Sequence, residues 1–505
     1  MASLSCLPRL QQVNDHFRKG RIDALSALFR ELVFHFVRTT IHARGECQLN
    51  IVSRMVALAV IVLAPLPLGS TEQIWICIWC ALMAASLVTA DLDGIGREDV
   101  RLLAPLLVTL AMVAAIIIVQ EWREPPFALG SPVWQLLSTT VLGVPAPSRI
   151  STTVNGPWLA VGYPLLLAMV FIRAFAISTD ASSARRLLLV LAWAGCAYAV
   201  YGILAEVGDP NGLLSRRKEA YLGYATGTFV NRNTAAVFWG SGAVLFLLPL
   251  LRFAHRRDHP DAPASSGFSD RVAFYSSSPV ALGIGLAICV TATAMTGSRA
   301  GLLLSICALL LGCGLYLAPL PIGKLRRWGF AAGIPLVALL LLDLVGGAVA
   351  GRIGTYGLID EQRAYAYQSA IAIIRDHPML GIGLGNFEAT FPAYRTAELG
   401  SLGIWDRAHS TPLELAAELG VPAASFIVVC GLWYIYLLLR SSLRRKRDRY
   451  IPIIGASVAV LGLVHSCIDF SVQIPGFGVF FAAIVGCGLA QSLPSELRKE
   501  RGKFK

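Results

Sequence analysis

Long apolar runs recur along the chain and are separated by shorter polar segments. A helix needs about 20 mainly apolar residues to cross the hydrocarbon core of a bilayer. Twelve runs approach this length, near residues 51–69, 73–90, 102–119, 158–178, 187–206, 234–253, 278–296, 300–319, 329–350, 412–439, 451–468 and 474–492. Because backbone N–H and C=O groups find no water inside a bilayer, such runs form helices. The pattern predicts an all-α polytopic membrane protein with about twelve transmembrane helices.

Composition supports this prediction and excludes a soluble protein. Hydrophobic residues make up 55% of the 505 positions and charged residues only 15%, and soluble domains carry far more charge. The polar segments divide the chain into a basic amphipathic segment at 1–50, a transmembrane domain at 51–492 and a basic tail at 493–505. The longest polar loop, 351–411, lies between the predicted ninth and tenth helices.

The placement of lysine and arginine predicts the orientation. If the N-terminus is cytoplasmic, 29 of the 43 basic residues lie in cytoplasmic segments, as the positive-inside rule requires. Both termini are then cytoplasmic, and the 351–411 loop lies on the outer face. Since the basic residues are scattered among loops, the net charge of +12 indicates contact with membrane lipids rather than binding of nucleic acid.

Three basic residues stand where predicted helices enter the membrane from the outer face. Arg232 precedes the sixth helix, Arg299 the eighth and His409 the tenth. Helices that start on this face direct their unpaired N–H groups and positive dipole ends toward it, which favours an anion. Guanidinium groups add forked donors that suit phosphate oxygens, so we predict a diphosphate site. The alternative is that each arginine only caps a loop or contacts lipid headgroups.

His409 lies just before a predicted helix start. Thr411 is the expected N-cap, Pro412 suits the first turn and Glu414 completes a Thr-x-x-Glu capping box. The positive helix end and the arginines disfavour an imidazolium, whereas Glu414 or Glu418 would favour it. We predict a neutral His409 that can accept a proton from a sugar hydroxyl. A loop histidine without chemistry is the alternative interpretation.

Nucleotide and metal sites find little support. Residues 381–386 alternate glycine with other residues but lack the lysine of a phosphate-binding loop, so we expect a turn there. No outer cluster of His, Asp and Glu has convincing metal-ligand spacing. Neither a metal nor another cofactor is therefore expected.

Four short motifs stand in the second half of the chain. They are Thr296-Gly297-Ser298-Arg299-Ala300-Gly301, then Asp376-His377-Pro378-Met379-Leu380-Gly381-Ile382-Gly383, then His409-Ser410-Thr411-Pro412-Leu413, and finally Leu463-Val464-His465-Ser466-Cys467-Ile468-Asp469-Phe470 before Gln473-Ile474-Pro475. Together they resemble the motifs of the O-antigen ligase and polymerase superfamily. The resemblance covers roughly residues 190–490.

The resemblance implies an activity and roles for individual residues. Members of this superfamily are metal-independent membrane glycosyltransferases of the GT-C type. They take a glycan from undecaprenyl diphosphate at the periplasmic face of the bacterial inner membrane. By resemblance, His409 is the catalytic base and Arg299 binds the diphosphate. A further family arginine best matches Arg232, but Arg216 and Arg217 are close enough to leave that assignment open.

The remaining candidates have supporting roles. Glu414 and Glu418 follow His409 on the predicted tenth helix, and Asp469 stands near the outer end of the eleventh. For Asp469 we favour packing or hydrogen bonding between helices over chemistry.

The acceptor is not identified by the sequence. Polymerases transfer the glycan to a second lipid-linked repeat unit, whereas ligases transfer it to the lipid A core. The variant residues Val230-Asn231-Arg232-Asn233 and Asp469-Phe470-Ser471-Val472-Gln473-Ile474-Pro475 favour polymerisation of O-antigen or exopolysaccharide units. A secondary transporter of the bicarbonate type is the alternative from another class. Transporter sites gather near the bilayer midplane, but these candidates cluster at the outer rim, which favours an enzyme.

Overall fold

The computed structural model describes residues 43–92, 95–125, 129–145, 148–214, 216–256, 278–320, 361–400 and 405–493. The chain forms two units, Met1–Met55 and Val56–Lys505. In the first unit only residues 43–55 are described, and they belong to helix α2 (Ala43–Leu63). Most of the predicted amphipathic segment 1–50, the predicted ninth helix 329–350, residues 351–360 of the outer loop and all but the first residue of the 493–505 tail lie outside the described residues.

The second unit is built almost entirely from helices, as the apolar runs predict. Its apolar helices are α3 (Gln73–Val88), α4 (Arg97–Gln120), α6 (Gly156–Ala160) with α7 (Gly162–Ile177), α8 (Ala181–Gly208), α9 (Arg232–Arg256), α11 (Pro279–Met295), α12 (Arg299–Leu317), α18 (Val421–Arg444), α19 (Tyr450–Ser466) and α20 (Pro475–Ala490). Within the described residues, six helices are long and apolar enough to cross a membrane. Five shorter apolar helices occupy other predicted runs. A mostly helical protein with several helices that could span a membrane is thus confirmed, while the count of twelve spans and the GT-C type stay predictions.

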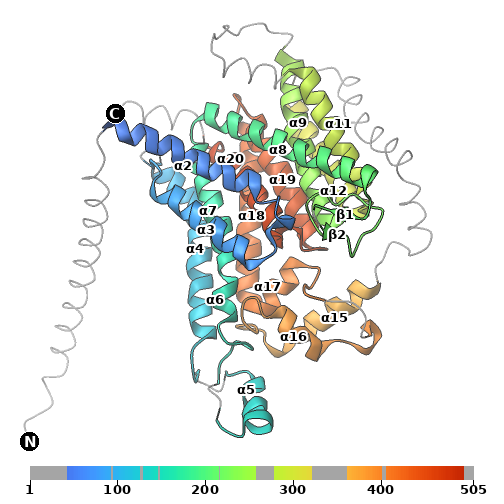
Figure 1. Ribbon diagram of the computed structural model, residues 1–505. Helices are drawn as coiled ribbons and strands as arrows, with labels where there is room; N and C mark the ends of the chain where they lie inside the picture. The colour runs from blue at the N-terminus through green and yellow to red at the C-terminus, as the bar shows by residue number, and fades with distance from the viewer. Residues whose placement is uncertain are drawn as a thin grey trace, which may run out of the picture. The chain divides into compact units, whose positions relative to one another are not determined.

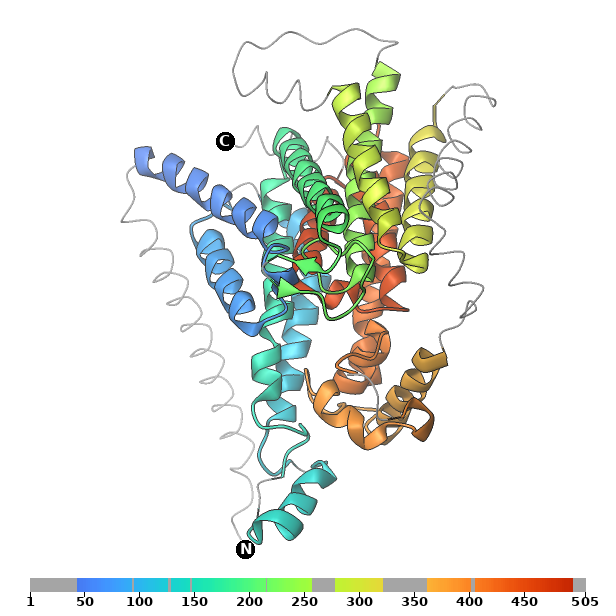
Figure 2. The same ribbon diagram turned by 45° about the vertical axis from the view of Figure 1, so that its right-hand side comes forward.

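Helix α9 lies at the centre of the second unit. Every residue from Asn233 to Leu248 is buried, because α8, α11, α12 and α19 pack around the helix. Figures 1 and 2 show α9, α11 and α12 side by side. Small residues permit close approach elsewhere: a Cβ atom added to Gly455 of α19 would lie 3.0 Å from the Cα atom of Gly488 in α20. Close packing of this kind stabilises helices in a lipid environment.

The tenth predicted helix, 412–439, is wrong as a single element. The chain forms α17 (Thr411–Leu419) and α18 (Val421–Arg444), with a break at Gly420. Gly420 has a φ of 84°, and a Cβ atom there would overlap the backbone carbonyl of Met379. Val421 N–H donates to the carbonyl of Pro378 (2.8 Å) instead of continuing the helix. The short α17 therefore belongs to residues 361–419, which we call the outer segment after its predicted location, rather than to a span.

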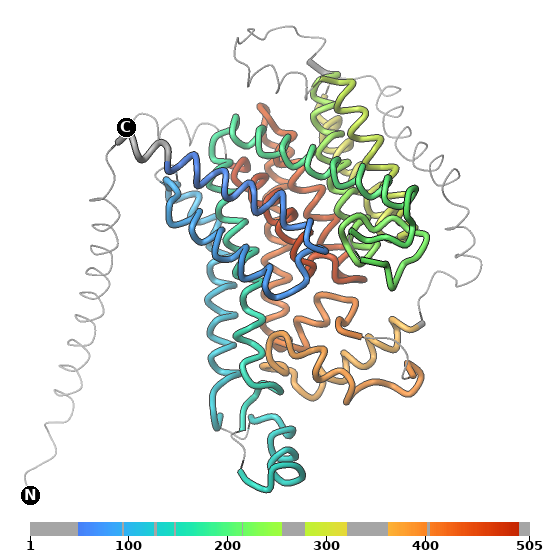
Figure 3. Tube along the Cα trace, viewed as in Figure 1, coloured from blue at the N-terminus to red at the C-terminus, as the bar shows by residue number. Residues whose placement is uncertain are grey.

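The outer segment forms a small core of its own. Helices α15 (Glu361–Asp376), α16 (Phe387–Tyr394) and α17 pack together, and their buried side chains include Ala366, Ala370, Ile373, Phe387 and Phe391. Figures 1 and 3 show the three helices gathered at one end of α18.

Residues 381–386 form a turn, as expected. Gly381, Gly383 and Gly385 all have positive φ. The buried Gln120 side chain at the end of α4 donates to the carbonyls of Leu380 (2.6 Å) and Glu418 (2.7 Å) and accepts from Leu384 N–H (3.2 Å). These bonds anchor the outer segment to α4.

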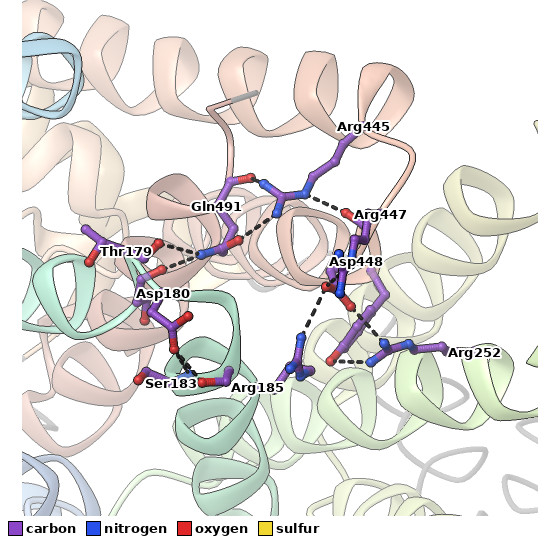
Figure 4. Close-up of polar contacts among 12 residues, drawn as sticks. Thr179, Asp180, Ser183, Arg185, Arg252, Arg445, Arg447, Asp448 and Gln491 are labelled. Atoms are coloured by element: carbon purple, nitrogen blue, oxygen red, sulfur yellow. Dashed lines mark hydrogen bonds and ion pairs between the residues drawn. The ribbon is translucent and has the colours of Figure 1, made fainter. Parts of the chain in front are cut away.

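A polar cluster, which we call the Asp448 cluster, lies where α9 and α18 end and α19 begins. The buried Asp448 carboxylate accepts a hydrogen bond from Arg185 (3.1 Å) and forms an ion pair with Arg252 (2.8 Å), as Figure 4 shows. In the same cluster Arg445 donates to the Gln491 side chain (2.8 Å). The cluster joins the start of α8, the end of α9, the α18–α19 loop and the end of α20.

Replacing Gly420 by alanine tests the break between α17 and α18. We expect Gly420→Ala to destabilise the protein by about 3 kcal/mol, because alanine resists this backbone conformation and its Cβ meets a carbonyl. The matched control is Gly143→Ala, which also has positive φ (64°) but no heavy atom within 4 Å of the added Cβ. That variant should lose only about 1 kcal/mol. Thermal unfolding of the purified protein in detergent measures both, and equal losses would contradict the proposed overlap.

Candidate functional site

Segments far apart in the sequence meet at the N-terminal ends of α9, α12 and α17. His409 Nδ1 lies 4.0 Å from Asp469 Oδ1. Asn233 Nδ2 donates to Asp469 Oδ2 (2.6 Å), and Ser298 Oγ donates to Asn233 Oδ1 (2.8 Å). Ser298 immediately precedes Arg299. The contacts link the predicted base to the turn that carries the predicted diphosphate ligand, and we call this set the outer site.

Asp469 takes part in most of these contacts. Its side chain is only 1% exposed, so its charge needs hydrogen-bond donors. Besides Asn233, it accepts from Phe470 N–H (2.7 Å) and from Arg363 Nη2 (3.2 Å). The sequence predicted packing or hydrogen bonding between helices for Asp469, and its bonds to Asn233 and Arg363 join the turn after α19 to α9 and α15.

His409 is held in an uncommon backbone conformation. Its φ is +52°, a region that few residues other than glycine adopt and that concentrates at functional sites. The imidazole meets the Trp405 ring at 5.3 Å and the Phe470 ring at 4.8 Å, both edge to face. The backbone carbonyl accepts from Tyr367 Oη (3.0 Å). The ring is therefore fixed while 17% of the side chain stays exposed.

The capping box expected at this helix is wrong. The N-cap residue is Ser410, and Thr411 is already the first helical residue. Glu414 accepts instead from Ala408 N–H (2.8 Å) and from Arg407 Nη1 (3.1 Å). The left-handed turn at His409 explains the difference, because it directs the Ala408 amide toward the helix. Glu414 thus holds the residue before the histidine.

Glu414 and Glu418 form a buried acidic pair one helical turn apart. Glu418 accepts from Phe387 N–H (3.1 Å) at the start of α16. Burial raises the pKa of Glu418 to about 8, and the nearby charge of Glu414 acts in the same direction. Burial also raises the pKa of Glu414, against the opposing charge of Arg407. The pair joins α16 and α17 to the loop that carries His409.

Arg232 lies beside the tight turn that precedes Arg299. Arg232 lies over the rings of Tyr224 (4.6 Å) and Tyr221 (5.4 Å). Gly297 has a φ of +60°, and an added Cβ there would lie 3.4 Å from Arg232 Nη1. Arg299 is the first residue of α12, whose N-cap Ser298 accepts from Gly301 N–H (3.2 Å). The Arg232 guanidinium thus lies beside the turn that leads into the N-terminus of α12, and a guanidinium and a helix N-terminus both favour an anion.

Arg216 and Arg217 lie on the short hairpin of β1 (Gly212–Leu213) and β2 (Arg216–Arg217). Both are exposed. Arg216 Nη2 faces Glu72 Oε1 at 3.7 Å, with 66% of the arginine side chain exposed. Exposed ion pairs of this length contribute little. The described contacts therefore link Arg232, and neither of these two residues, to the turn before Arg299.

Two residues of the outer site were missed by the sequence reasoning. Asn233 follows Asn231 and Arg232 directly, and a polar side chain at the start of an apolar helix could have indicated a site. Arg363 carried no such signal, because its contact with Asp469 joins positions 106 residues apart. Within the described residues, no group of three His, Cys, Asp or Glu side chains is placed to hold a metal ion.

Comparison with known proteins adds one finding. The family model described as O-Antigen ligase matches residues 284–428. The matched segment includes Arg299 and His409 and lies between Arg232 and Asp469. No curated protein matches the chain.

Replacing Glu418 by glutamine tests the acidic pair. Since burial raises the pKa of Glu418, the folded protein holds a proton that the unfolded chain releases. This contribution to stability is fully present below the ordinary carboxyl value of 4.5 and is lost as the pH rises through about 8. Glu418→Gln mimics the protonated form at every pH. We therefore expect its melting temperature to fall less than that of the wild type between these pH values.

The control is Glu388→Gln, on the exposed first turn of neighbouring α16. It should reproduce the pH dependence of the wild type. If the melting temperatures of the wild type and of Glu418→Gln fall equally as the pH rises, a raised pKa at Glu418 is contradicted.

Proposed function

We propose that this member of the O-antigen ligase superfamily transfers a glycan from undecaprenyl diphosphate to a hydroxyl acceptor at the periplasmic face of the bacterial inner membrane. The observation that carries the proposal is the chain of contacts from His409 through Asp469 and Asn233 to Ser298. It joins a base to a turn flanked by two arginines. Glycan transfer from a diphosphate needs both parts in one pocket.

His409 is the proposed base. Its Nδ1 side faces Asp469, so the imidazole is oriented with Nε2 toward the acceptor. The acceptor hydroxyl attacks the anomeric carbon and gives its proton to Nε2. A new glycosidic C–O bond forms as the C–O bond to the diphosphate breaks. Attack from the side opposite the leaving group inverts the anomeric configuration.

Arg299 and Arg232 are the proposed diphosphate ligands. The leaving group takes the electron pair of the broken bond, so negative charge grows on its oxygens. Two guanidinium groups and the N-terminus of α12 stabilise that charge with donors already in place. They supply the electrostatic role that a divalent cation has in other transferases, and we propose a metal-independent reaction.

Two versions of this function differ in the acceptor of the glycan. The sequence around Arg232 and Asp469 favours polymerisation of O-antigen or exopolysaccharide units. The description of the matching family favours ligation to the lipid A core. Both versions use the same donor and the same base, and they differ only in the hydroxyl that attacks.

Disruption of the gene in its host distinguishes the two. For the polymerase we expect loss of long glycan while single repeat units are still attached to the surface. Long chains that accumulate on undecaprenyl diphosphate would show a ligase instead. Gel analysis of surface glycans together with mass spectrometry of the lipid-linked pool measures both. Unchanged glycans with altered uptake of bicarbonate or another solute would overturn glycan transfer and support a transporter.

Single substitutions test the assigned roles. We expect His409→Ala, Arg299→Ala and Arg232→Ala each to slow glycan transfer about a hundredfold or more, because each removes the base or a donor to the leaving group. Membrane insertion should be unaffected. Arg216→Ala and Arg217→Ala are the matched controls and should retain wild-type glycan length and yield. Complementation of the disrupted host measures all five, and full activity of His409→Ala or Arg299→Ala would remove the proposal.

A further inference from the structure

Arg363 of α15 reaches the outer site from the outer segment. Its Nη1 donates to the carbonyl of Ile468 (2.8 Å), and its Nη2 donates to Asp469 Oδ2 (3.2 Å). One guanidinium therefore binds two consecutive residues of the turn after α19. The arginine side chain is 24% exposed and the aspartate side chain 1%, so water screens this ion pair weakly.

Asp469 alone would be an unfavourable neighbour for a base. An opposite charge within about 4–6 Å shifts the pKa of a group by about 1–3 units in favour of its charged form. The carboxylate lies 4.0 Å from His409 Nδ1, so by itself it would hold a proton on the imidazole. A protonated imidazole cannot accept the proton of an acceptor hydroxyl.

Other charged and titratable groups of the described part also face this region. Burial raises the pKa of Tyr221, and the charges of Asp469, Arg232, Arg363 and Asp406 act on it as well. Glu414 of α17 is bonded to Arg407, His465 of α19 lies one turn before Asp469, and Arg299 begins α12. The acidic group Asp469 lies 4.0 Å from His409 Nδ1. The charge that opposes Asp469 therefore acts on the imidazole as well.

We propose that Arg363 is a positioning residue that neutralises Asp469, so that the carboxylate orients His409 without keeping it protonated. The inference rests on the proposed function, because it assumes that neutral His409 is the base. It explains why the aspartate beside the base is bonded to a guanidinium from a separate helix. Arg363 itself acts through Asp469 and touches neither donor nor acceptor.

The test is the pH dependence of glycan transfer. We expect Arg363→Gln to move the acid limb of the rate profile about one pH unit upward, which lowers transfer at neutral pH about threefold. The rate at high pH should remain close to that of the wild type. Arg363→Lys keeps the charge and should keep the wild-type profile. The control is Arg375→Gln, an equal change of charge on the exposed last turn of α15.

Asp469→Asn provides a second, isosteric variant. It removes the negative charge that Arg363 opposes, so its acid limb should move to lower pH. In the Asp469→Asn background, the further change Arg363→Gln should shift the limb less than it does in the wild type. Both measurements use the full chain in lipid nanodiscs with undecaprenyl-diphosphate-linked glycan extracted from the host.

The outcomes separate this inference from the proposed function. If the wild type transfers no glycan, the proposed function fails. If the wild type transfers glycan but Arg363→Gln loses activity equally at every pH, Arg363 has only a structural role and the inference is overturned. A raised KM for the lipid-linked donor without a shift of the acid limb would make Arg363 a diphosphate ligand, which also overturns it. An unshifted limb in Asp469→Asn has the same meaning.

Discussion

The outer site depends on the hydrogen bonds and the ion pair that surround the buried carboxylate of Asp469. An ionised group removed from water is unstable unless several donors surround it. Here the donors come from α9, α15 and the backbone of the following residue, through Asn233, Arg363 and Phe470 N–H. To satisfy one charge, three separate parts of the chain must meet at one point. The position of His409 then follows, because its ring packs between Phe470 and Trp405 beside that carboxylate.

The same helices carry polar contacts at both ends and apolar packing between them. Helix α9 runs from Asn233 at the outer site to Arg252 in the Asp448 cluster, and α19 runs from Tyr450 in that cluster to His465 near Asp469. Nineteen residue steps of α9 correspond to about 30 Å, close to the hydrocarbon thickness of a bilayer. Polar contacts at each end fix the register of both helices, and a fixed register keeps the proposed base and the arginines at constant separation.

Much of this architecture could be predicted because it depends on local pattern. Apolar runs indicate helices wherever they stand, and short polar turns around Arg299 and His409 indicate helix starts. The break at Gly420 could not be found in this way, since it depends on a carbonyl of Met379 that meets the glycine only in the folded protein. Glu414 was assigned to a capping box because the spacing fits one. The left-handed turn at His409 gives the carboxylate a different amide. Arg363 and Asn233 act through contacts with Asp469 that no local spacing reveals.

The arginines of the outer site are held in two different ways, and the difference has a chemical consequence. Arg363 and Arg407 lie against carboxylates, Asp469 and Glu414, which offset their charge. Arg232 lies over two tyrosine rings. A ring face holds a guanidinium by its quadrupole and carries no net charge, so it orients the group without cancelling its field. The charges of Arg363 and Arg407 are thus offset beside His409, where the proposed reaction requires a proton to be accepted. Beside Gly297 and Arg299, where the proposed diphosphate develops its charge, the tyrosine rings position Arg232 and add no opposing charge of their own.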